Sequence, residues 1–171
     1  MLRLTALATV ALTVLLAFVA VADAGLYDIK KVLRDDIERI APKTDVPIRL
    51  PARMTLDYDK NAFGDGFARK QSYDLDINAV KKCGANVCFL ASFQGERGGT
   101  PAFKKTVSLA KGITGYYKPL TCGGSCSPPM IQWIQRGVLY SIQAKVDAPG
   151  KGGTRRAMVR AANSSIRATP R

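Results

Sequence analysis

The sequence predicts an α+β domain, an antiparallel sheet of about six strands with an N-terminal and a C-terminal helix packed on it. Three observations lead there. Apolar residues recur at helical spacing over Leu26–Ile40, polar and apolar residues alternate over Ser72–Val80, and a tight hairpin around Arg136-Gly137 is followed by a second helical pattern over Thr154–Ile166.

Residues 1–24 have the pattern of a signal peptide. Arg3 precedes an almost wholly apolar run from Leu4 to Val21, and Ala22-Asp23-Ala24 forms a small-x-small cleavage site. An uncleaved anchor is the alternative, because a run of about 18 apolar residues can span a bilayer. Cleavage leaves 25–171, a length suited to a single domain with one core. We therefore expect an exported protein, periplasmic or secreted.

The first element after the signal is an amphipathic helix over Leu26–Ile40, with polar residues of both signs between its apolar positions. We expect this helix to pack on the core rather than lie in a membrane surface, because membrane-surface helices are more uniformly basic. Ala41-Pro42 ends it, since a proline disfavours helical geometry in the preceding residue.

Two segments follow before the sheet. Val46–Pro51 is bracketed by prolines, which predicts a short edge strand. Asp57–Gly66 begins like an EF-hand calcium loop, but Ala62 occupies the position of the turn glycine and Ala68 that of the closing glutamate. We therefore predict a turn-rich polar loop without calcium.

Strand patterns then continue along the chain. Ser72–Val80 forms a half-buried strand, and Val87, Phe89, Ala91 and Phe93 form the apolar face of the next. If Cys83 lay directly opposite Cys88, Phe89 and Phe93 would point away from this face, so we expect either a bulge near Val80–Lys82 or a disulfide loop outside the ladder.

Further strands are predicted at Phe103–Ala110 and Ile113–Tyr117, joined at Lys111-Gly112, with Tyr116 and Tyr117 on opposite faces. The last hairpin pairs Ile131–Gln135 with Val138–Val146. Its inner face is Ile131, Trp133, Val138, Tyr140, Ile142, Ala144 and Val146. A helix from Thr154, a suitable N-cap, to Ile166 then covers the sheet with Ala157, Met158, Ala161, Ala162 and Ile166.

Four cysteines in an exported chain indicate two disulfides. The pairs Cys83 with Cys88 and Cys122 with Cys126 are favoured because they close the shortest loops. A zinc ion held by all four is the alternative, although structural zinc sites usually space their cysteines by two residues.

The chain contains no histidine. This excludes Ser-His-Asp and Cys-His catalysis and the imidazole ligands of most catalytic zinc sites. Glycosidase chemistry needs a pair of carboxylates, and no spacing links the candidates Glu38 and Glu96. We therefore predict a protein that is not an enzyme, with no catalytic residue, no metal and no cofactor.

The net charge is +13, from 26 Lys plus Arg and 13 Asp plus Glu. Such an excess attracts polyanions. The candidate polyanion-binding residues are Arg97, Lys104, Lys105, Lys111, Lys118, Arg155, Arg156 and Arg160, with Arg167 and Arg171 beyond them. Candidate partners are an anionic envelope polymer, a lipid surface or a protein; we expect no specific nucleic acid. The alternative is a secreted inhibitor or effector that contacts a protein through Gln94–Thr100 or the Cys122–Cys126 loop.

The run Ile131-x-Trp133-x-x-x-Gly137-x-x-Tyr140-x-Ile142, followed by Ala161-Ala162-Asn163-Ser164-Ser165-Ile166, resembles the closing hairpin and helix of small exported bacterial domains of uncharacterised function. It is also similar to the sheet-and-helix ectodomains of bacterial envelope regulators. The resemblance extends to Val46–Pro51. It implies an extracytoplasmic sheet-and-helix module and supplies no catalytic residue. From the charge, the cysteines and the absence of catalytic motifs we expect an exported, disulfide-stapled binding or interaction module of the cell envelope.

Overall fold

A computed structural model describes residues 25–170; the predicted signal peptide lies outside them. The elements in chain order are β1 (Gly25–Asp28), α1 (Ile29–Val32), α2 (Arg34–Ile40), η1 (Ala41–Lys43), β2 (Arg53–Leu56), β3 (Phe63–Arg69), β4 (Ser72–Asn78), β5 (Phe89–Arg97), β6 (Thr106–Ser108), η2 (Ala110–Gly112), β7 (Thr114–Lys118), β8 (Thr121–Cys122), β9 (Cys126–Ser127), β10 (Met130–Gln135), β11 (Val138–Ala144) and α3 (Gly153–Arg167).

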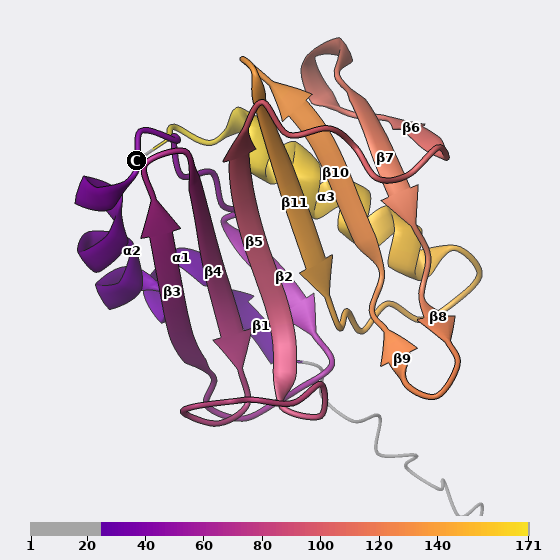
Figure 1. The fold of residues 1–171 in the computed structure, drawn as a ribbon. Coiled ribbons are helices and arrows are strands. Elements are labelled where there is room, and N and C mark those ends of the chain that lie inside the picture. Colours follow the sequence, from indigo (N-terminus) through magenta and orange to yellow (C-terminus); the bar gives the residue numbers. More distant parts are fainter. Residues whose placement is uncertain (1–24, 171) are drawn as a thin grey trace, which may run out of the picture.

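The main sheet has seven antiparallel strands in the order β3-β4-β5-β11-β10-β7-β6, which confirms the predicted α+β class. The helices and the β1–β2 pair lie on one face of this sheet, while the face toward the viewer in Figure 1 carries no helix. Among residues 25–170, no helix has the length and apolar character needed to cross a bilayer.

The core lies between the sheet and the helix layer. The predicted inner face of the last hairpin is confirmed from Ile131 to Ala144, and Val146 is only partly buried. Trp133 and Tyr140 are cross-strand partners with stacked rings 5.5 Å apart. Stacked aromatic pairs add to the stability that their buried area provides.

The N-terminal helix is shorter than predicted. Gly25–Asp28 forms β1 and pairs with β2, so the helix begins at Ile29, where the Asp28 carboxylate accepts a hydrogen bond from the Lys31 amide at 3.1 Å. Leu26 is therefore 63% exposed, although it continues the helical pattern. The end of the α-helix before Pro42 agrees with the prediction.

Val46–Pro51 is not a strand, which corrects the predicted edge strand. Its apolar residues Val46, Ile48 and Leu50 are buried, but the segment has no ladder partner. Sheet tyrosines hold it instead: the Arg49 amide donates to the Tyr73 hydroxyl at 3.2 Å, and the Tyr140 hydroxyl donates to the Pro47 carbonyl at 3.0 Å.

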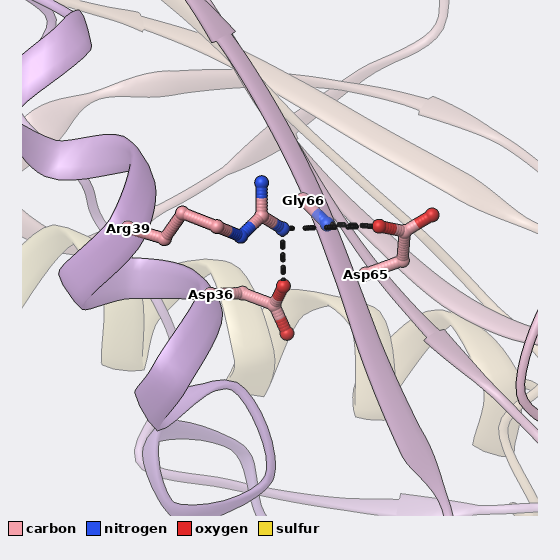
Figure 2. A network of polar contacts seen from close by, with 4 residues as sticks. All are labelled: Asp36, Arg39, Asp65 and Gly66. Atoms are coloured by element: carbon pink, nitrogen blue, oxygen red, sulfur yellow. Dashed lines mark hydrogen bonds and ion pairs between the residues drawn. The ribbon is translucent and has the colours of Figure 1, made fainter.

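The predicted loop over Asp57–Gly66 is wrong from Phe63 onward, where the chain forms the edge strand β3. Its glycines serve close packing rather than turns. A Cβ on Gly66 would lie 2.8 Å from the Leu75 side chain, and one on Gly64 would collide with Asp36 of α2. Figure 2 shows Arg39 of α2 paired with Asp36 at 2.5 Å and reaching Asp65 of β3 at 3.9 Å.

The β4–β5 connection has the second of the two arrangements that the sequence left open, together with a bulge at a different position. The Cys83–Cys88 disulfide closes a loop outside the ladder, and a bulge lies where Ile77 pairs with Ala91 but Asn78 pairs with Phe89. The bulge is thus at Leu90 and not near Val80–Lys82. Two predicted inward positions are consequently wrong: Val87 is 86% exposed in the loop, and Phe89 shares the uncovered face with its partner Asn78.

The remaining hairpins are confirmed with shorter strands, because the predicted Phe103–Ala110 is a strand only over β6 and the predicted Val138–Val146 ends with β11 at Ala144. The β6–β7 hairpin turns at Lys111-Gly112 and the β10–β11 hairpin at Arg136-Gly137, all four residues with positive φ. Tyr117 is buried and Tyr116 is half-exposed. Helix α3 starts one residue before Thr154, with Gly152 and not Thr154 at the N-cap, and Ala157 of its predicted stripe is only partly buried.

Candidate anion-binding groove

Helix α3 carries a row of cations beside its buried stripe. Met158, Ala161, Ala162 and Ile166 face the sheet. Arg156, Arg160 and Arg167 are spaced by four and seven residues, which places them along one side of the helix. At 1.5 Å per residue, the row from Arg156 to Arg167 extends about 16 Å.

Arg160 and Arg167 of this row border two adjoining hollows. One has a volume of about 530 Å³ and is lined by Lys30, Leu50, Ala52, Arg160, Asn163, Ser164, Arg167 and Ala168. The other, of about 360 Å³, adds Leu26, Arg53 and residues of β2. Ala52, Arg160 and Ser164 line both, so the two form one groove between α3, α1 and β2. We call it the basic groove; its cations are Lys30, Arg53, Arg160 and Arg167.

Hydrogen bonds fix the floor of the basic groove. The Ser164 hydroxyl accepts from the Ala52 amide at 3.0 Å. The carboxamide oxygen of the preceding residue, Asn163, accepts from the Ala110 amide at 2.6 Å, which ties α3 to η2. Arg160 and Arg167 therefore project from a helix that is anchored on both flanks.

The end of α3 is held by a buried arginine. Arg49 is 7% exposed, and its guanidinium donates to the carbonyls of Ala168 at 2.9 Å, Ile166 at 3.4 Å and Ser165 at 3.5 Å. These are the unpaired carbonyls of a helix C-terminus, where a positive charge is favourable. Arg49 thereby sets the position of Arg167 at the rim of the groove.

The charge of the basic groove is not neutralised by ion pairs. Between residues 25 and 170 the only ion pairs are the two that Arg39 makes with Asp36 and Asp65. One acidic residue, Asp147, lines the second hollow, and none lines the first. An anion in the groove would therefore meet cations that have no competing carboxylate bound to them.

The structure brings together only some of the cations that the sequence predicted to bind polyanions. Arg160 and Arg167 line the basic groove, and Arg155 and Arg156 line a further hollow that also includes Arg160. Arg155 lies near β7, since its charge opposes the burial that raises the pKa of Tyr117.

The other predicted cations lie elsewhere. Lys104, Lys105, Lys111 and Lys118 lie along the β6–β7 edge, where the Lys118 ammonium is 5.9 Å from the centre of the Phe103 ring. Arg97 donates to the Asp45 carbonyl at the end of β5. Arg171 is outside the described residues.

Sequence reasoning missed Lys30 and Arg53 as groove residues. Lys30 belonged to a helix assigned to core packing, and Arg53 followed the supposed edge strand. Their approach to Arg160 depends on the pairing of β1 with β2 and on the docking of α3, for which no local pattern exists.

All four cysteines are in disulfides, with the predicted pairing of Cys83 with Cys88 and Cys122 with Cys126. This leaves no thiolate for the alternative zinc site. Neither pair lines the basic groove. In the described part of the chain, no cluster of three or more Cys, Asp or Glu side chains is placed to hold a metal ion.

Comparisons with protein-family models, with curated proteins and with solved structures found no match to this chain.

Proposed function

We propose that this protein is an exported, non-enzymatic binding module of the cell envelope that holds an extended anionic polymer in the basic groove. The observation that carries the proposal is the convergence of Lys30, Arg53, Arg160 and Arg167 on two adjoining hollows, with no ion pair to neutralise them. The sequence-predicted arginines Arg155 and Arg156 extend this surface along α3.

The form of the groove favours a polymer over a small anion. Its cations are spread out rather than gathered around one point, because Arg160 and Arg167 lie about 10 Å apart along α3 while Lys30 and Arg53 come from α1 and β2. Arg53, Arg160 and Arg167 are solvent-exposed, so each contact is screened by salt and weak by itself. A chain with repeated charges gains from several such contacts at once.

The two disulfides support the exported setting, since such bonds persist in oxidising compartments. Export itself remains a prediction from residues 1–24. The alternative of a secreted protein-binding inhibitor named two loops, but Gln94–Arg97 of the first belongs to the central strand β5. The alternative therefore rests on the Cys122–Cys126 turn, where Gly123 and Gly124 have open space around them and nearby Leu120 is 55% exposed.

The test is elution from immobilised heparin and dextran sulfate, two unrelated anionic polymers. The groove variant carries Lys30→Gln, Arg160→Gln and Arg167→Gln. We expect it to elute at lower salt than the wild type and to show a shallower dependence of affinity on salt, because fewer counterions are released on binding.

The matched control removes the same one lysine and two arginines elsewhere, as Lys43→Gln, Arg69→Gln and Arg136→Gln; all three are exposed and none lines the groove. Both variants have the same net charge. If the salt concentration at elution falls equally for both variants, net charge alone causes retention and the groove proposal is wrong.

A further inference from the structure

A second hollow lies on the uncovered face of the sheet, where β4 and β5 meet the Cys83–Cys88 loop. Its volume is about 430 Å³, within the range of small-molecule sites. It is lined by Asp76 and Asn78 of β4, Phe89 of β5, and the loop residues Cys83 to Asn86. We call it the loop hollow. No residue is common to it and the basic groove.

Asn78 is the residue that points to a ligand. It is only 8% exposed and lines the loop hollow, yet its carboxamide takes part in no hydrogen bond within residues 25–170. Because the carboxamide borders the hollow and has no partner within the described residues, its donors and its acceptor are available to a bound molecule.

The bulge builds this hollow. Because Leu90 is the extra residue between the Ile77–Ala91 and Asn78–Phe89 pairs, the Phe89 ring turns from the core onto the uncovered face. Bulges commonly redirect a side chain next to a binding site. The loop above is fixed by its disulfide and by the Lys145 ammonium, which donates to the carbonyls of Asn86 at 2.6 Å and Val87 at 3.3 Å.

The side chains of the loop hollow define the chemistry of its occupant. The Asp76 carboxylate accepts hydrogen bonds, the Asn78 carboxamide donates and accepts, and Phe89 presents an apolar ring surface. An anion is disfavoured, because Asp74 and Asp65 flank Asp76 on the same face. An ammonium ion is disfavoured as well, because it carries no acceptor for the Asn78 amino group.

Vicinal hydroxyl groups satisfy both polar side chains, since each hydroxyl donates and accepts. The C–H face of a sugar ring offers an apolar surface to Phe89. We propose that the loop hollow binds one unit of a neutral saccharide through Asp76, Asn78 and Phe89. This site is separate from the basic groove, so the two proposals stand or fall independently.

The test is a titration of ¹⁵N-labelled protein with three neutral trisaccharides at millimolar concentration: maltotriose, cellotriose and the β-linked N-acetylglucosamine trimer. At least one should shift the Asn78 side-chain amide signals and the backbone amides of residues 84–89. Asn78→Leu keeps the size of the side chain but removes its hydrogen bonds to the ligand. It should weaken the binding of that saccharide at least about tenfold.

Phe89→Ala should also weaken binding, and the matched control Asn61→Leu, an exposed amide in the loop before β3, should leave it unchanged. The wild-type titration needs no variant to fold, so the proposal remains testable if Asn78→Leu does not fold. It is overturned if no trisaccharide shifts these signals, if Asn78→Leu binds like the wild type, or if only a neutral capped peptide, acetyl-trialanine amide, produces the shifts.

Discussion

Replacing Arg49 with methionine tests how α3 is held in place. The substitution keeps an unbranched side chain of similar length in the buried site and removes the guanidinium that donates to the carbonyls of Ala168, Ile166 and Ser165. These carbonyls lie at the end of the helix, so no intrahelical amide replaces the lost donor.

Two effects set the magnitude. Hydrogen bonds to a charged group contribute about 1.5–3 kcal/mol in total at a site like this. A partly buried cation at a helix C-terminus adds up to about 2 kcal/mol. Burial of the guanidinium has a desolvation cost that methionine avoids, which offsets part of the sum. We therefore expect Arg49→Met to lower the free energy of unfolding by about 2–3 kcal/mol.

The assay is urea denaturation with both disulfides intact, supported by thermal melting, in which a loss of this size lowers Tm by about 4–12 °C. Arg167→Met is the matched control, because it removes an exposed arginine from the same helix end and should change stability by less than about 0.5 kcal/mol. Arg49→Lys should be intermediate, since lysine keeps the charge but not the planar donors. If Arg49→Met is as stable as the wild type, the capping argument is refuted.

Two further predictions concern packing and pH. Gly153→Ala should destabilise the protein by about 1–3 kcal/mol, because the new Cβ would collide with the Ala148 backbone carbonyl, whereas Gly123→Ala, with open space around it, should be neutral by urea denaturation. Burial, and then the Asp74 charge, raise the pKa of Asp76 to about 6. The folded state therefore retains a proton that the unfolded chain loses near pH 4, so the free energy of unfolding should fall between about pH 4 and pH 6 and stay level above that. Asp76→Asn should remove this decrease; an unchanged pH profile would contradict the assignment.

The sequence by itself determined the elements whose signals are local. Alternation of polar and apolar residues identified β4, and the Arg136-Gly137 turn identified the β10–β11 hairpin. The short spacing of the cysteines within each pair identified both disulfides. The last helix was found within a residue at each end. In each case the residues that form the element are neighbours in the chain, so their pattern contains the necessary information.

Only the tertiary structure determined the elements whose sequence pattern was ambiguous or whose packing partner lies far away in the chain. Leu26 continued a helical stripe, but pairing of Gly25–Asp28 with Arg53–Leu56 placed it in a strand. Gly64 and Gly66 looked like turn residues, and only contact with α2 shows that they allow a helix to approach β3.

The same holds for the candidate sites. Three of the cations predicted to bind polyanions, Arg155, Arg156 and Arg160, do lie together along α3, because they belong to one helix. The groove also needs Lys30 and Arg53, which reach Arg160 only through the docking of three elements far apart in the chain. Charge and composition are properties of single residues, whereas convergence on one surface is a property of the fold, and for this reason the sequence predicted a basic protein but not its groove.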